Sequence, residues 1–164
     1  MDVDPIAVTY VDRDCVTPQS GARLSGFSGG QAVVRVELRT AANTVVIPTV
    51  RTVAADLAAR ADFDLDAIDD LRMAVDDLCA VLVRIAADDA MLECRFAVCA
   101  ERIEVVAEVD VDGGADPLPT GSFGWRVLEC LVDEVSVVLV PVEAGRATRI
   151  CVTLAKNAVR AHQR

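Results

Sequence analysis

The fold of this chain follows from the segment Gly121-Ser-Phe-Gly-Trp-Arg-Val-Leu-Glu-Cys-Leu-Val-Asp-Glu-Val135. A turn with two glycines opens the segment, and a strand pattern closes it. Between them, apolar residues recur at helical spacing: Trp125, Leu128, Leu131 and Val132. Two glycines at the start of a helix let backbone N–H groups approach a phosphate at the positive end of the helix dipole. The alternative is that these glycines form only a turn, which is their common role before a helix.

A second segment, Asp70-Leu-Arg-Met-Ala-Val-Asp-Asp-Leu-Cys-Ala-Val-Leu-Val83, also has helical spacing. Together the two segments resemble the N box and the second glycine box of the GHKL (Bergerat-fold) ATPases, in the variant found in RsbW-type anti-sigma factors. In that variant a Leu-x-x-Ala-Val-x-Glu helix is followed by a Gly-x-Gly helix that runs into a Leu-x-Asp-Glu-Val strand. The resemblance extends in order from about Val33 to Leu154, which is most of the chain.

Hydrophobic periodicity gives the order of the elements. It predicts strands at 34–38, 92–98, 103–109, 135–140 and 148–154, and helices at 50–61, from Asp64 or Asp66 to about 87, and from 123. Residues 110–119 and 143–145 are expected to be a loop and a turn, and the short connection at 100–101 predicts an antiparallel hairpin. The expected fold is α+β: a two-layer α/β sandwich with a mostly antiparallel sheet and helices on one face. This layout agrees with the Bergerat fold that the resemblance implies.

The length of 164 residues predicts one domain with short extensions. Residues 1–30 keep no hydrophobic period and are expected to be a flexible extension; residues 31–156 form the ATPase-like domain, and 157–164 a tail. The composition is 53% hydrophobic but only 4% aromatic, so Val, Ala and Leu must fill the core.

The formal net charge of −10 argues against binding to nucleic acid or to an anionic membrane, since both require Lys and Arg. It permits a basic protein partner; alternatively, the acidity only keeps an apolar chain in solution. No signal-peptide pattern opens the sequence, and the apolar run Val135–Val142 is too short to span a bilayer. A cytoplasmic protein is expected.

The histidine and cysteine content restricts the kinds of catalytic or metal site that the chain can form. The only histidine is His162, which removes Ser-His-Asp and Cys-His catalysis and argues against a zinc site. No C-x-x-C pair occurs among the six cysteines, which are expected to be buried, reduced thiols: Cys15, Cys79, Cys94, Cys99, Cys130 and Cys151. No metal site is expected from the residues alone.

The resemblance identifies candidate site residues on the 70–83 segment. In the family, an N-box glutamate activates the attacking hydroxyl and an asparagine four residues later holds magnesium. The corresponding residues here are Asp77 and Val81, which share a helix face but leave magnesium without an amide ligand. Arg84 lies in the same sector as Asp70 and Asp77, where it would neutralise phosphate or pair with Asp77. A solvated charged face is the alternative.

The two glycine boxes supply the remaining candidates. The family's first box has an adenine-reading aspartate at a strand end followed by a glycine, and Asp110, Asp112 and Gly113 are the candidates here. The best register places Val109 at the aspartate, and Asp112-Gly113-Gly114 is also a common turn sequence. The second box offers Gly121, Ser122 and Gly124 for phosphate. Next to it, Arg126 is a candidate contact for phosphate or a protein, or simply an exposed helix residue.

The resemblance implies an anti-sigma factor that sequesters an alternative sigma factor of RNA polymerase and is released by a STAS-domain antagonist. It also implies a homodimer. Phosphoryl transfer depends on neutralising the metal-bridged phosphates, so Val81 predicts a degenerate ATP site. The alternative is an active serine/threonine kinase for the antagonist, with ATP and magnesium as cofactors and Asp77 as general base. A third hypothesis is a regulatory module that binds another protein or a small anion, with redox control through Cys79 or Cys130.

Overall fold

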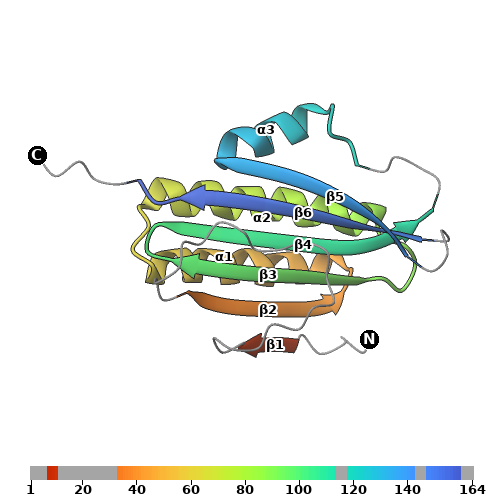
Figure 1. Ribbon diagram of the computed structural model, residues 1–164, viewed down its shortest axis with the longest axis horizontal. Helices are drawn as coiled ribbons and strands as arrows, with labels where there is room; N and C mark the ends of the chain where they lie inside the picture. The colour runs from red at the N-terminus through yellow and green to blue at the C-terminus, as the bar shows by residue number, and fades with distance from the viewer. Residues whose placement is uncertain (1–6, 11–32, 114–117, 143–146, 160–164) are drawn as a thin grey trace, which may run out of the picture.

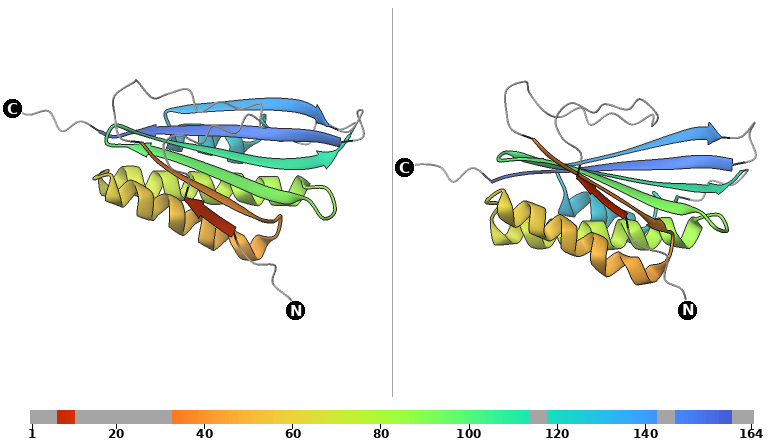
Figure 2. Two further views of the ribbon diagram at one scale, coloured as in Figure 1. Left: turned by 60° about the horizontal axis from the view of Figure 1, so that its bottom comes forward. Right: turned by 90° about the horizontal axis from the view of Figure 1, so that it is seen from below.

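The computed structural model describes residues 7–10, 33–113, 118–142 and 147–159. Three α-helices lie on one side of a six-stranded sheet (Figures 1 and 2). The strands are β1 (Ala7–Tyr10), β2 (Val34–Ala41), β3 (Met91–Cys99), β4 (Arg102–Asp112), β5 (Glu134–Val142) and β6 (Ala147–Asn157). The helices are the 3-10 turn η1 (Thr44–Val46) and α1 (Ile47–Arg60), α2 (Leu65–Ile85) and α3 (Phe123–Leu131).

Every pair of neighbouring strands in the sheet is antiparallel, in the order β1-β2-β3-β4-β6-β5. Strands β3 and β4 form the predicted hairpin, with Cys99 opposite Arg102. Strand β6 inserts between β4 and β5, so the last strand of the chain lies inside the sheet and β5 lies at its edge (Figure 1).

The hydrophobic core lies between the helices and one face of the sheet, which we call the helix face. On β4 this face presents Ile103, Val105, Ala107, Val109 and Val111, all buried in the core. Helix α2 adds a buried stripe at helical spacing: Leu71, Ala74, Val75, Leu78, Cys79 and Leu82. Because side chains alternate along a strand, a helix-side stripe on β4 requires its even-numbered residues to point the other way.

We call the other side of the sheet the far face; on β4 it presents Arg102, Glu104, Val106, Glu108 and Asp110. Glu104 and Glu108 are only 2% and 3% exposed, and each is paired with an arginine. The far face is therefore built from charge pairs around small apolar residues, and the helix face from aliphatic side chains.

The predicted α+β two-layer sandwich is confirmed, and its arrangement is consistent with the GHKL type. The structure adds β1, a strand within the segment predicted as a flexible extension, where no hydrophobic period marked it. Strand β4 continues to Asp112 because β6 pairs with it along its whole length, so the predicted loop begins later than expected. The predicted turn at 143–145 lies outside the described residues. Within the described residues, no helix is long and apolar enough to span a membrane.

Candidate functional site

Helix α2 begins where Asp64 caps it, since the Asp64 carboxylate accepts a hydrogen bond from the Ala67 N–H at 2.8 Å. This outcome selects Asp64 from the two predicted caps, and Asp66 lies in the first turn, where its charge suits the helix dipole. Burial of the Leu71 and Leu78 stripe fixes the rotation of the helix. Asp77 and Arg84 therefore face away from the core.

Asp77 is an exposed carboxylate without a side-chain hydrogen bond or ion pair in the described part of the chain. Partial loss of water around it raises its pKa, and the negative charge of Asp76 raises the pKa further. Asp76 itself is bound at 2.9 Å by Arg51 of α1. The two adjacent carboxylates thus differ: one joins the helices, and the other is left available to a ligand or partner.

The residues predicted to share a helix face with Asp77 do not form one cluster with it. Val81 is half-buried, packs against the core and offers no oxygen. Arg84 is exposed and does not pair with Asp77. Asp70 is bound by Lys156 at 2.9 Å. Among the described residues, no group of three or more His, Cys, Asp or Glu side chains is placed to hold a metal ion.

The glycine turn before α3 has room around it. A methyl group at Gly121 would meet nothing within 4 Å, and one at Gly124 would meet only the Ser122 hydroxyl at 4.0 Å. Ser122 caps α3, because its hydroxyl oxygen accepts from the Trp125 N–H at 3.2 Å. Phe123 is 82% exposed. In this structure the turn forms a capped helix start and leaves an aromatic ring in solvent.

Trp125, the only tryptophan of the chain, is buried in the core, and its indole N–H donates to Glu129 at 3.1 Å. Arg126, on the same first turn, is exposed. Helix α3 packs against α2 beside the sheet (Figure 1), so the two predicted boxes are neighbours in space. The solvent-facing residues of this pair, Asp77, Arg84 and Arg126, are candidates for contact with a partner.

The residues of the first glycine box are divided between the two faces of the sheet. Val109 is 1% exposed on the helix face, where the resemblance places the adenine-reading aspartate. Asp110 points to the far face, and Arg149 of β6 binds both of its carboxylate oxygens, at 2.7 and 2.9 Å. Asp112 and Gly113 are exposed at the end of β4. The structure therefore does not bring Asp110 together with Asp77.

Asp110 and Arg149 also line a polar cavity of about 150 Å³ on the far face. Arg39, Glu93 and Glu108 line it too, and Arg39 pairs with Glu93 at 3.1 Å. Within this lining Arg39 compensates Glu93 and Arg149 compensates Asp110, and both ion pairs join neighbouring strands.

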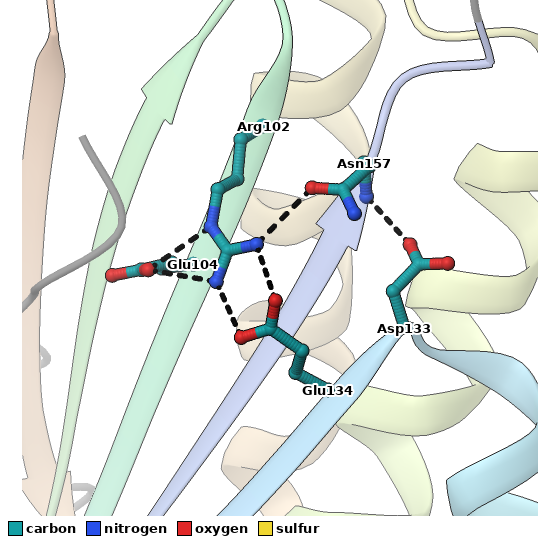
Figure 3. A network of polar contacts seen from close by, with 5 residues as sticks. All are labelled: Arg102, Glu104, Asp133, Glu134 and Asn157. Atoms are coloured by element: carbon teal, nitrogen blue, oxygen red, sulfur yellow. Dashed lines mark hydrogen bonds and ion pairs between the residues drawn. The ribbon is translucent and has the colours of Figure 1, made fainter. Parts of the chain in front are cut away.

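A network at the opposite end of the sheet was not predicted (Figure 3). Arg102 of β4 binds Glu104 at 3.1 Å and both oxygens of Glu134 at 2.8 and 3.0 Å, which ties the edge strand β5 across β6. Asn157 accepts from Arg102 through its side chain and donates its backbone N–H to Asp133 at 2.7 Å. The Asp-Glu pair of the Leu-x-Asp-Glu-Val segment thus has a structural role: Asp133 and Glu134 tie the start of β5 to the ends of β4 and β6.

The described cysteines only partly follow the prediction of burial. Cys79, Cys94, Cys99 and Cys151 are buried, whereas Cys130 on α3 is exposed, so that expectation was wrong for Cys130. A hydrogen bond with Cys79 and burial raise the pKa of Cys94, and burial and Glu108 raise the pKa of Cys151 to about 12. These shifts keep the Cys94 and Cys151 thiols protonated and unreactive.

The fold, with α2 and α3 as neighbours, is consistent with a GHKL-type sandwich, and comparison with known proteins indicates which kind of protein the chain is similar to. The chain is similar to the anti-sigma-F factor RsbW of Mycobacterium tuberculosis, in strain CDC 1551 / Oshkosh and in strain ATCC 25618 / H37Rv. In both cases the identity is 40% over 109 residues, which is 65% of this chain and 64% of the relative. No family model matches the chain. The matches confirm the resemblance to RsbW-type anti-sigma factors.

Proposed function

We propose that this chain is an anti-sigma factor that binds and sequesters an alternative sigma factor, one of the sigma-F kind. The observation that carries the proposal is the 40% identity over 109 residues to anti-sigma-F factor RsbW. The role is assigned to the domain of residues 31–156, acting in the cytoplasm. The net charge of −10 suits a basic, DNA-reading partner, because complementary charge speeds encounter.

Release by a STAS-domain antagonist and assembly into a homodimer complete the proposal, and both rest on the resemblance. The surface proposed for these partners is the solvent side of α2 and α3, with Asp77, Arg84 and Arg126 exposed on it. Exposed charge beside the half-buried Val81 and the exposed Phe123 gives this surface both polar and apolar contacts, as protein interfaces require.

The nucleotide site is proposed to be degenerate. Magnesium requires oxygen ligands, and Val81 offers none at the position of the family's asparagine. Asp110 is engaged by Arg149 on the far face, and the best register of the resemblance aligns the apolar Val109 with the adenine-reading aspartate. These residues do not fit a magnesium-bound nucleotide, so no catalytic step is assigned to them.

An active serine/threonine kinase acting on the antagonist is the second candidate. One observation favours it: Asp77 is exposed, without a side-chain partner among the described residues, and its pKa is raised, as suits a general base. Phosphate transfer to the antagonist from Mg-ATP, lost in Asp77→Asn, would establish this function. Absence of Mg-ATP binding would remove it.

The proposed function is tested by capturing the tagged full chain from a lysate of its own host, with and without Mg-ATP, and then repeating the binding with the purified sigma factor. We expect a sigma factor in both conditions. Arg126→Glu should weaken binding about tenfold, as loss of a central interface arginine does. Arg60→Glu, an exposed residue at the end of α1, is the matched control and should bind normally. Recovery of no sigma factor would refute the assignment.

A further inference from the structure

Lys156, near the end of β6, contacts both α2 and α3, the helices that carry the two segments resembling family motifs. Its ammonium nitrogen lies 2.9 Å from the carboxylate of Asp70 on α2 and 2.9 Å from the carbonyl oxygen of Leu131 on α3. The Lys156 side chain is only 13% exposed. An ammonium withdrawn from water in this way is stable only while both acceptors stay in place, so the contacts fix the two helices relative to each other.

The position of Lys156 suits the electrostatics of α3. Leu131 is the last residue of this nine-residue helix, where unpaired carbonyl groups carry partial negative charge. The helix has no basic residue in its own last turn. Lys156, which is the only lysine in the chain, supplies the missing cation from the sheet.

Asn157, the next residue of β6, holds the chain just beyond the end of α3. The backbone N–H of Asn157 donates to Asp133 at 2.7 Å, two residues beyond the end of α3 (Figure 3). Consecutive residues at the end of β6 therefore hold the C-terminal end of α3 and the start of the edge strand. At the other end of α3, the turn at Gly121 and Gly124 has open space around it.

We propose that Lys156 is a positioning residue: it holds α3 against α2 and so sets the direction in which residues 121–124 face a bound partner. Asp70, as the partner of Lys156, helps to hold the two helices together and is not part of a nucleotide site. Loss of the ammonium removes the polar link from α2 to the last carbonyl of α3, so α3 is then held by apolar packing and by the Asn157–Asp133 hydrogen bond and tilts more freely at its C-terminal end. The second half of the proposal, that this direction matters for a partner, rests on the proposed function.

Hydrogen exchange of backbone amides in the full chain, without any partner, tests the first half. Lys156→Met keeps the aliphatic stem and removes both polar contacts. Exchange in residues 126–131 should accelerate about tenfold relative to wild type, the effect of losing a charge-assisted hydrogen bond at a helix end. Amides of α1 should not change. Unchanged exchange in α3, or equal acceleration in α1, would overturn the proposal.

Two further variants make the test specific. Asp70→Asn removes the ion pair and leaves the bond to Leu131, so it should give a smaller acceleration in α3; it also serves if Lys156→Met does not fold. Arg39→Met removes an arginine that pairs on β2 and β3, remote from α3, and should leave α3 exchange unchanged. Equal effects of Arg39→Met and Lys156→Met would contradict a local role for Lys156.

Affinity for the purified sigma factor tests the second half. Lys156→Met should weaken binding about tenfold, and Lys156→Arg, which keeps the positive charge in a larger and planar group, should restore part of it. Arg39→Met should bind as wild type does. Normal binding by Lys156→Met would refute the positioning role. If the wild-type chain itself binds no sigma factor, the proposed function fails, and hydrogen exchange still decides whether Lys156 holds α3.

Discussion

The two faces of the sheet stabilise the molecule in different ways. Aliphatic side chains of the helix face pack under α1 and α2, and the buried cluster they form contains only apolar residues. The far face carries buried carboxylates that are held by arginines: Glu108 by Arg95 of the neighbouring strand β3 at 2.6 Å, and Glu104 by Arg102 of its own strand at 3.1 Å. Apolar packing is non-directional, whereas an ion pair has a preferred geometry. The helix face therefore supplies most of the stability, and the far face fixes the strand register.

The difference between the two faces also determines where α2 and α3 lie. Helices α2 and α3 attach to the helix face through leucines and Trp125, so their charged residues are left in solvent. The anchors that restrict them, Lys156 and Asn157, come from the end of β6. An apolar layer holds the helices on the sheet, and a few polar contacts determine how they are oriented.

The largest effect is expected in the apolar layer. Leu78→Ala should lower the free energy of unfolding by about 3 kcal/mol, because it leaves a cavity beneath a fully packed helix. Met73→Ala, at an exposed position of the same helix, should change it by less than about 0.5 kcal/mol. Urea unfolding followed by circular dichroism measures both. Similar losses for the two variants would contradict the assignment of the core to this face.

Arg102 should show the next largest effect. Arg102→Met leaves the Glu104 carboxylate, 3% exposed, without its cation and should cost about 3 kcal/mol of unfolding free energy. Replacing both residues, as Arg102→Met with Glu104→Met, should recover much of the loss, because an apolar pair of similar size leaves no buried charge. Arg60→Met, whose ion pair with Asp56 is exposed, is the control and should cost less than about 0.5 kcal/mol. Failure of the double variant to recover stability would refute this account of the far face.

A smaller effect, dependent on pH, is expected at Glu134. Arg102 lowers the pKa of Glu134, so the ion pair contributes stability above the unfolded-state pKa, and that contribution is lost as pH falls through the folded-state pKa. Since Glu134 is largely exposed, Glu134→Gln should cost less than about 1 kcal/mol at pH 7. Near pH 3 the variant and the wild type should be equally stable. Thermal unfolding at both pH values measures the difference, and a loss of equal size at pH 3 would exclude the ion pair as its cause.

The sequence predicted one layer much better than the other. Hydrophobic periodicity identified the buried stripe of α2, the alternation of β3 and β4, and the order of elements from residue 34 onward, because apolar burial leaves a regular pattern. It did not predict that Arg149 holds Asp110 or that Lys156 joins two helices. Such pairs join residues that are distant in sequence, 39 positions apart for Arg149 and Asp110, and no local pattern records them. Strand β1 was missed for the same reason, since it depends on pairing with β2.

The smallest expected change in stability is at Asp77, and its sign is the opposite of the others. Because the pKa of Asp77 is raised in the folded protein, its ionised form is disfavoured, and its contribution to stability falls as pH rises through that pKa. Asp77→Asn should therefore stabilise the protein slightly at pH 7, by less than about 0.5 kcal/mol given its exposure, and should have no such benefit near pH 3. Thermal unfolding at the two pH values measures this, with Asp69→Asn, another exposed carboxylate of α2, as the matched control. If Asp77→Asn also weakens binding of the sigma factor or the antagonist while the control does not, the residue is maintained for contact and not for the fold. A destabilised variant at pH 7 would show instead that the Asp77 carboxylate supports α2.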